Sequence, residues 1–180
     1  MVVRTLRMLV LSLISVVILA GCSGRGSDMS PEEALEYFVT QARSGNLVDY
    51  RLTIYFFYPD FLPWLPPANL NDLKQSEFVS IITVGGGWLD MTFGWDVELS
   101  NQISVNSLLL VEEGSRMMPR IYYVFETNRG RKIFDVAMWG DNGSIFVNGL
   151  EIERNVVFYD IIRPFLPQNA VENMDMLFDR

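Results

Sequence analysis

Hydrophobic and polar residues change their pattern twice along this 180-residue chain. Residues 8–20 form an apolar run that only Ser12 and Ser15 interrupt. Residues 30–83 place apolar side chains at intervals of three and four, which predicts helices. From about residue 103 the apolar residues fall into short segments between turn signals, which predicts strands. Helices followed by an antiparallel meander indicate an α+β fold.

Three helices are expected in the first half of the domain. The first begins at Ser30, since Ser30 and Glu33 can form a capping box, and it ends at Gly45. Residues 47–58 are rich in β-branched and aromatic side chains, but their apolar positions also share one helical face, so we favour a second helix over a strand. Residues 71–83 predict a third helix, which ends before three consecutive glycines.

Strands are expected in the second half, over residues 103–113, 120–127, 132–139 and 145–148. Turn signals at 113–115, 128–130 and 141–143 separate them and predict three consecutive antiparallel strands. The apolar stretch 154–162 fits a helix or a strand, and the pattern leaves both open. Residues 170–178 predict a short terminal helix.

The apolar run at the start has the form of a secretory signal. Arg4 and Arg7 give it a positive head, and its 13 residues are too few for an ordinary membrane span. The run leads into Leu19-Ala20-Gly21-Cys22, where two small residues precede the one cysteine of the chain. The chain here resembles the bacterial lipoprotein precursors, whose lipobox has an aliphatic residue, two small residues and a cysteine.

That resemblance implies how the protein is processed and held. In the family, the cysteine thiol receives a diacylglyceryl group, the signal is cut just before it, and the new amino terminus is acylated as well, with fatty acids such as palmitate. In this chain the cleavage would fall between Gly21 and Cys22, with the lipid on Cys22. In a Gram-negative cell, Ser23 permits passage to the outer membrane. Two or three acyl chains, at about 0.8 kcal/mol for each buried methylene, anchor firmly.

Composition and charge exclude several kinds of chemistry. The chain has no histidine and one cysteine, which excludes a Ser-His-Asp or Cys-His mechanism, a His-ligated metal and an intrachain disulfide. We expect no metal and no cofactor. Without residues 1–21, 12 basic and 22 acidic residues remain, a net charge of −10 that argues against nucleic acid. The basic cluster Arg129, Arg131 and Lys132 is interpreted as solubilising a hairpin tip.

The order of predicted elements in residues 30–149 is similar to that of the NTF2-like (cystatin-like) domains found in many small bacterial lipoproteins. The opening Pro-Glu-Glu-Ala-Leu-Glu-Tyr-Phe helix, the turn at 44–46 and the closing hairpin at 139–147 carry this resemblance. It implies N-terminal helices packed on a curved antiparallel sheet, and a β-sandwich is the alternative. The expected organisation is a signal peptide at 1–21, a lipidated flexible tether at 22–29, and one α+β domain over 30–180 with a C-terminal extension from about 150.

Aromatic side chains are concentrated in residues 55–95. They fill the core, cover a surface that meets a partner, or line an apolar pocket. The core is the first choice among these three, and the sequence leaves all of them open. The residues singled out for a pocket or a partner surface are Tyr55, Phe57, Trp64, Trp88 and Trp95.

Three acidic residues, Asp90, Asp96 and Glu98, lie close to these aromatic residues in the sequence. A carboxylate in an apolar pocket can have its pKa raised and serve as a general acid or base, as in some enzymes of the NTF2-like group. Tyr50 or Tyr55 would then supply a hydrogen-bond donor. No spacing in the chain requires this chemistry, so no catalytic residue is assigned.

These features together predict a lipid-anchored protein of the bacterial cell envelope, on the periplasmic face of the outer membrane in a Gram-negative cell. We expect a non-enzymatic domain that binds an envelope protein or supports an envelope complex. Two alternatives stay open: a module that binds a lipid or another apolar ligand, and an isomerase- or dehydratase-like enzyme. The expected partners are the membrane, through the lipid anchor, and a protein, without nucleic acid or metal.

Overall fold

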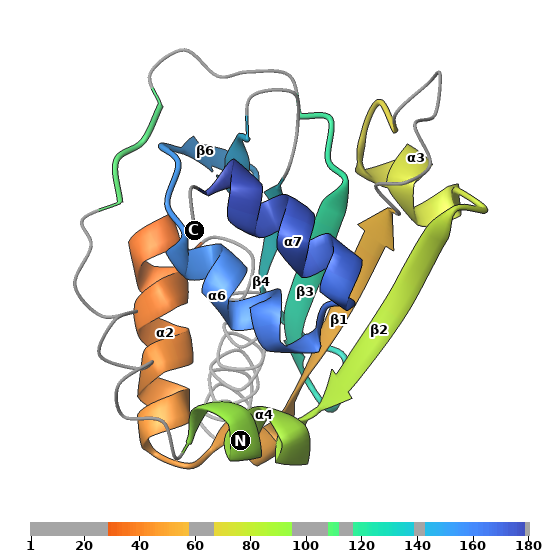
Figure 1. Ribbon diagram of the computed structural model, residues 1–180. Helices are drawn as coiled ribbons and strands as arrows, with labels where there is room; N and C mark the ends of the chain where they lie inside the picture. Colours follow the sequence, from red (N-terminus) through yellow and green to blue (C-terminus); the bar gives the residue numbers. More distant parts are fainter. Residues whose placement is uncertain (1–28, 58–66, 95–107, 112–116, 139–142, 179–180) are drawn as a thin grey trace, which may run out of the picture.

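The computed structural model describes residues 29–57, 67–94, 108–111, 117–138 and 143–178. These residues contain five α-helices and six β-strands. The strands form one sheet in the order β2-β1-β3-β4-β5-β6, and every neighbouring pair is antiparallel. The described part of the chain is therefore an α+β domain with a single sheet, not the two facing sheets of a sandwich (Figure 1).

The strands are β1 (Tyr50–Phe57), β2 (Val79–Gly85), β3 (Ile121–Thr127), β4 (Lys132–Met138), β5 (Ile145–Val147) and β6 (Leu150–Ile152). The α-helices are α2 (Pro31–Arg43), α3 (Leu70–Gln75), α4 (Gly86–Phe93), α6 (Val157–Ile162) and α7 (Gln168–Leu177). The short 3-10 helices η1 (Leu47–Asp49) and η2 (Arg163–Phe165) follow α2 and α6.

The main core lies between one face of the sheet and the helices α2, α4, α6 and α7 (Figure 1). At its centre the ring of Phe38 from α2 lies 5.3 Å from the rings of both Phe93 and Phe125, measured between centroids. A smaller cluster covers the opposite face of the sheet, where α3 contributes its buried Leu73. The other buried members of this outer cluster are Phe57, Tyr122, Ala137 and Phe146.

The first helix forms as its local sequence predicts. The backbone N–H of Ser30 donates to Oε2 of Glu33 at 2.8 Å, and the backbone N–H of Glu33 donates to Oγ of Ser30 at 3.2 Å. This capping box satisfies two amide groups that have no partner inside the helix. Gly45, just past the end of α2, has a φ of 66°, a conformation that side-chain-bearing residues rarely adopt. The predicted start and end of this helix are confirmed.

The helix predicted for residues 47–58 is wrong. They form η1 and then β1, a central strand paired with β2 on one side and β3 on the other. Leu52 and Ile54 are buried in the main core, while Tyr55 and Phe57 join the outer cluster. Residues 50–54 alternate apolar and polar side chains as a strand does, but residues 55–57 are all apolar because both faces of the strand are covered there. The apolar positions of the whole segment also share a helical spacing, which led to the wrong prediction.

The helix predicted for residues 71–83 is right only in its first part. α3 ends at Gln75, and β2 begins at Val79 and pairs with β1. The β-branched residues of this segment fit a strand once an exposed edge of β1 is available to them. The glycines that were expected to end a helix instead begin α4, where Gly86 lies so close to the carbonyl of Val48 that no Cβ would fit.

The meander of three strands is confirmed, since β3, β4 and β5 lie where the sequence predicts strands. Gly130 has a φ of 79° in the turn between β3 and β4, as a tight hairpin requires. Most of the strand expected at 103–113 lies outside the described residues. Of the part described, Leu110 makes an isolated antiparallel bridge to Ile152 of β6, a strand that the sequence pattern did not predict.

The end of the chain belongs to the same core as the rest of the domain. Residues 154–162, for which the sequence left helix and strand open, contain helix α6. The predicted terminal helix is present as α7. The hydroxyl of Tyr123 on β3 donates to the carbonyl of Phe158 at 2.9 Å, which ties α6 to the sheet. Arg163 donates to both carboxylate oxygens of Asp175, at 3.0 and 2.7 Å, and so joins α6 to α7. The segment expected as an extension therefore completes the domain.

Candidate functional site

The aromatic residues singled out from the sequence do not form one site. Tyr55 and Phe57 lie on the outer face of β1, where the ring of Tyr55 is 5.8 Å from that of Tyr122 and Phe57 is buried. Trp64 and Trp95 lie outside the described residues. Of the three interpretations of the aromatic residues, packing in the core therefore fits Phe57. Trp88 lies on α4, away from Tyr55 and Phe57.

The outer cluster is closed by polar and charged groups. The ammonium group of Lys74 on α3 lies 4.4 Å from the centroid of the Tyr122 ring, within cation–π distance. The hydroxyl of Tyr122 donates to Oδ2 of Asp135 at 3.0 Å, and Lys132 forms an ion pair with the same oxygen at 2.8 Å. These contacts assign Tyr55 and Tyr122 to the packing of α3 on the sheet.

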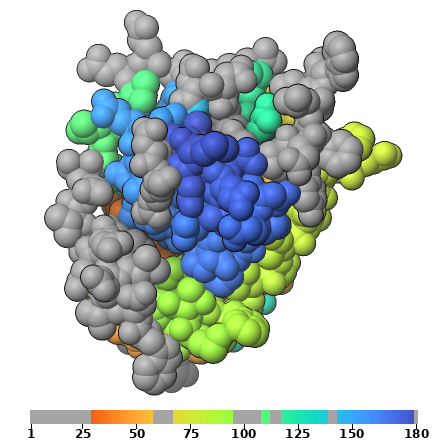
Figure 2. Space-filling view, in the orientation of Figure 1, coloured from red at the N-terminus to blue at the C-terminus, as the bar shows by residue number. Residues whose placement is uncertain are grey.

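Trp88 lies in an exposed apolar patch at one end of the domain. Trp88 is 65% exposed, and Met91, one helical turn further along α4, is 54% exposed. Val48 of η1 is 50% exposed, and Gly86 packs the first turn of α4 directly against η1. We call Val48, Trp88 and Met91 the end patch. Figure 2 shows α4, in yellow-green, at the lower end of the face in view.

Of the three acidic residues considered for catalysis, the structure describes Asp90 alone. It lies on α4, and its buried Oδ1 atom has no hydrogen-bond partner among the described residues. It is not among the described residues that line the pocket at the end of the sheet. Asp96 and Glu98 lie outside the described residues.

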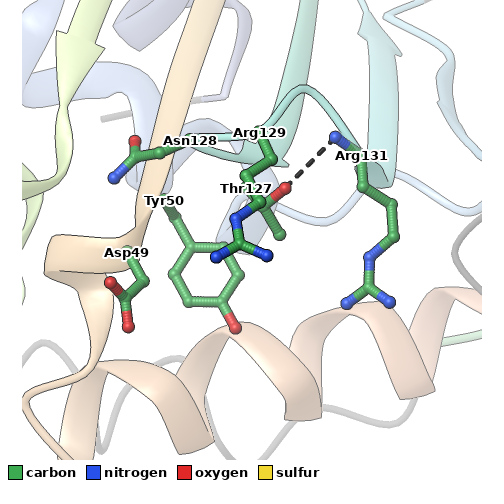
Figure 3. A pocket seen from close by; sticks show the side chains of 6 residues that line it. All are labelled: Asp49, Tyr50, Thr127, Asn128, Arg129 and Arg131. Atoms are coloured by element: carbon green, nitrogen blue, oxygen red, sulfur yellow. Dashed lines mark hydrogen bonds between the residues drawn. The ribbon is translucent and has the colours of Figure 1, made fainter.

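A pocket of about 500 Å³ lies at the same end of the sheet as η1. The described residues that line it are Asp49, Tyr50, Thr127, Asn128, Arg129 and Arg131. They come from the start of β1 and from the turn between β3 and β4, so the pairing of β1 with β3 brings them together. In Figure 3 the hydroxyl of Tyr50 and the side chain of Arg131 both point toward α2.

Hydrogen bonds hold the β3–β4 turn against η1. The backbone N–H of Asn128 donates to the carbonyl of Asp49 at 2.9 Å, and its side-chain amide donates to the carbonyl of Val48 at 3.0 Å. Within the turn, the backbone N–H of Arg131 donates to Oγ1 of Thr127 at 3.1 Å. Because η1 carries both Asp49 and Val48, the same short helix joins the pocket to the end patch.

Tyr50 forms the inner wall of the pocket. It is 8% exposed, its ring stacks on Phe125 at 4.9 Å, and its hydroxyl lies 2.6 Å from the hydroxyl of Tyr37. Burial, followed by the hydrogen bond with Tyr37, raises the pKa of Tyr50 to about 12, although the positive charge of Arg131 acts in the opposite direction. At neutral pH the pocket therefore contains a protonated phenol.

The raised pKa of Tyr50 predicts a loss of stability in alkali. The unfolded chain releases this proton near pH 10, while the folded chain holds it until about pH 12. Since the unfolded state then binds fewer protons, the free energy of unfolding falls as pH rises from about 10 to 12, by about 2–3 kcal/mol for this group. Urea denaturation of the purified protein at pH 8, 10, 11 and 12 measures this loss.

Tyr50→Phe is the control for that measurement, because it removes the titrating hydroxyl and keeps the stacked ring. The variant should have a shallower loss of stability between pH 10 and 12 than the natural protein. Burial also raises the pKa values of Tyr122, Tyr123 and Tyr159, so part of the loss should persist in the variant. Identical pH profiles for the two proteins would contradict the assignment to Tyr50.

The basic cluster seen in the sequence is divided between the two faces of the sheet. Lys132 pairs with Asp135 in the outer cluster, whereas Arg129 and Arg131 line the pocket. The interpretation of all three as solubilising groups at a hairpin tip is therefore incomplete. Two arginines on either side of a turn glycine were the available signal, but nothing local indicates that β1 supplies the opposite wall.

The described residues contain no group of three or more histidine, cysteine, aspartate or glutamate side chains placed to hold a metal ion. In this same part of the chain, no helix combines the length and the apolar character needed to cross a membrane. Gly21 and Cys22, the predicted cleavage and lipidation residues, lie outside the described residues.

The chain was also compared with known proteins. No family model, no curated protein and no solved structure matches it.

Proposed function

We propose that this chain is the precursor of a bacterial envelope lipoprotein whose domain binds a protein partner through the end patch. The lipid on Cys22 holds the mature protein to the membrane, on the periplasmic face of the outer membrane in a Gram-negative cell. The domain acts by binding and not by catalysis. The exposure of Trp88 and Met91 on α4, together with that of Val48 on the adjoining η1, is the observation that carries the binding part of this proposal.

The anchor is supported by the start of the sequence. A positive head, an apolar run of 13 residues and Leu19-Ala20-Gly21-Cys22 occur in the order that lipoprotein processing needs. Residues 22–29 then give a tether of up to about 25 Å at roughly 3.3 Å per residue. That length lets the domain stand clear of the bilayer surface.

We assign the domain to the NTF2-like class on the order and packing of its elements. The opening helix α2 packs on one face of an antiparallel sheet that contains the β3-β4-β5 meander, as that class requires. This chain differs from the element order expected for that class in its second half, where α6 and α7 pack on the same face of the sheet as α2. Ligand-binding and enzymatic members exist in this class, so the fold by itself does not select the function.

The end patch lies away from the point where the tether enters the domain. Met29 is held beside the β5–β6 turn, where its carbonyl accepts a hydrogen bond from the side chain of Asn148 at 2.9 Å. From there α2 runs 13 residues, about 20 Å, to the end that carries η1 and α4 (Figure 1). The end patch can therefore face away from the membrane that holds the lipid.

A protein suits this patch better than a lipid surface does. Tryptophan and methionine are enriched in protein–protein interfaces, and tryptophan is among the residues whose truncation costs most affinity. The mature chain carries a net charge of −10, so anionic lipid would repel it. An exposed apolar patch of this kind fits a partner that offers apolar side chains in return.

The test is recovery of a partner from cells. Trp88→Ala should reduce the crosslinked and co-purified partner at least tenfold after mild detergent extraction, because a central tryptophan typically contributes 2 kcal/mol or more to such an interface. Pull-down from membranes of the producing organism, with quantification by mass spectrometry, measures the loss.

Met176→Ala is the matched control, since Met176 is 69% exposed on α7, outside the end patch. It should leave recovery unchanged, while Met91→Ala should reduce it. A protein that runs as a lone monomer in every extract, with nothing captured after crosslinking, would refute partner binding. Equal recovery with Trp88→Ala would place the interface elsewhere.

A further inference from the structure

We propose that the pocket at the end of the sheet binds a ligand with one carboxylate group, held by Arg129 and Arg131, and with a hydroxyl or ammonium group that donates to Asp49. This site is separate from the end patch and goes beyond partner binding. Its volume of about 500 Å³ lies within the range of small-molecule sites, about 300–1,000 Å³.

The two arginines of the pocket carry charges that the described protein does not neutralise. Arg51, Lys132 and Arg163 each form an ion pair with a carboxylate at 2.7–2.8 Å. Arg129 and Arg131 form no ion pair with any described residue, although the chain has 22 acidic residues to 14 basic ones. Two guanidinium groups beside one pocket, neither in an ion pair with a described residue, provide planar donors that match a carboxylate in two-point hydrogen bonding.

The turn that carries these arginines is fixed before any ligand arrives. Thr127 accepts from the backbone of Arg131 and donates its own backbone N–H to the carbonyl of Arg131, at 3.1 and 2.9 Å. Asn128 is bound to the backbone of Val48 and Asp49. A rigid turn loses little conformational entropy on binding, which favours affinity at a small site.

Asp49 decides which anions fit. Its carboxylate lines the same pocket, so the three charged side chains sum to one positive charge. A dianion such as phosphate would be repelled by Asp49, whereas a monocarboxylate balances the site. The Asp49 carboxylate can then accept a hydrogen bond from a hydroxyl or an ammonium group of the same ligand. Sugar acids, hydroxy acids and the carboxyl end of a polypeptide have this combination.

The test is titration calorimetry of the lipidated full-length protein in non-ionic detergent with chosen probes. Glucuronate should bind, and glucose, which lacks the carboxylate, should not. The tripeptide Ala-Ala-Ala and its C-terminal amide form a second matched pair that distinguishes a polypeptide end from a sugar acid as the source of the carboxylate. Inorganic phosphate should bind at least tenfold more weakly than the better carboxylate probe.

The Arg129→Gln, Arg131→Gln double variant should weaken binding of that probe tenfold or more, and Asp49→Asn should raise the affinity for phosphate. Arg154→Gln is the control, because it makes the same kind of substitution at an exposed residue that does not line the pocket, and it should leave binding unchanged. Absence of binding by every carboxylate probe at 10 mM, or equal affinity in the double variant, would overturn the proposal. Since Trp88→Ala should leave probe binding intact, failure here is distinguishable from failure of partner binding.

Discussion

Replacing Cys22 with serine is expected to abolish both the lipid and the cleavage before residue 22. Serine lacks the thiol that forms the thioether, so the precursor should keep residues 1–21 and gain no acyl chain. Intact-mass analysis of the purified protein measures both changes at once. The natural protein should have the mass of residues 22–180 plus the acyl groups, and the variant should have the unmodified mass of the full chain.

The second half of this prediction concerns location. Two or three acyl chains bury tens of methylene groups, each worth about 0.8 kcal/mol, so the natural protein should be found almost entirely in washed membranes. A variant in which an ordinary cleavable secretory signal replaces residues 1–22 should move almost entirely into the soluble fraction. The acidic body, with a net charge of −10, provides no attraction to anionic lipid that would retain it.

Ser23→Ala is the control for both measurements, since it alters the residue next to the cysteine and keeps the thiol. It should leave acylation and cleavage unchanged. A natural protein with a bare thiol at Cys22, or with its leader still attached, would refute the lipoprotein assignment. Membrane retention of the protein secreted without Cys22 would show that another part of the chain binds the membrane.

Phe38→Ala should have the largest effect on folding, a loss of about 3–5 kcal/mol in the free energy of unfolding. Phe38 is fully buried, and its ring makes edge contacts with Phe93 and Phe125, so it joins α2 to α4 and to β3. With alanine, the protein would lose the free energy gained by burying the ring. A cavity would also remain among α2, α4 and β3, because the neighbouring side chains can fill it only in part. Urea denaturation in non-ionic detergent, followed by far-ultraviolet circular dichroism, measures this loss.

Two further variants make the result interpretable. Phe38→Leu keeps most of the buried volume and should cost less than half as much as alanine. Met176→Ala removes a side chain that is 69% exposed and should change stability by no more than about 0.5 kcal/mol. A cost below about 1 kcal/mol for Phe38→Ala would mean that the aromatic contacts among α2, α4 and β3 do not form the centre of the core.

The elements that could be predicted from the sequence are those whose signals lie close together along the chain. The capping box of α2 needs only Ser30 and Glu33, three residues apart, and the hairpin between β3 and β4 needs only the turn around Gly130. Such signals act through local backbone geometry, so they do not depend on which other elements lie nearby. For these elements the prediction and the structure agree.

The prediction failed for β1 and β2 because their conformation depends on partners that are distant in the sequence. β1 pairs with β3, some 70 residues later, and both faces of its second half are covered, so the alternation of residues 50–54 does not continue through residues 55–57. β2 depends on β1 in turn, because it forms by pairing with backbone N–H and C=O groups at the edge of β1. Neither fact can be found within a short window of sequence.

The candidate sites divide in the same way. Trp88 was recognisable as a surface candidate, but the exposure of Val48 and Met91 at the same end of the domain was not, since the packing of η1 against α4 is a tertiary contact. The pocket was not predicted at all. Its two walls, Asp49 with Tyr50 and Arg129 with Arg131, are joined only by the pairing of β1 with β3.

The sequence by itself determined the start and end of α2, the β3-β4-β5 meander, the absence of histidine chemistry and the expectation of a lipid at Cys22. These depend on neighbouring residues or on composition. Only the tertiary structure decided that residues 50–57 are a strand, that α6 and α7 complete the core, and that two arginines face an aspartate and a phenol across one pocket. The physical reason is that burial and strand pairing join distant residues, and no local propensity specifies which ones.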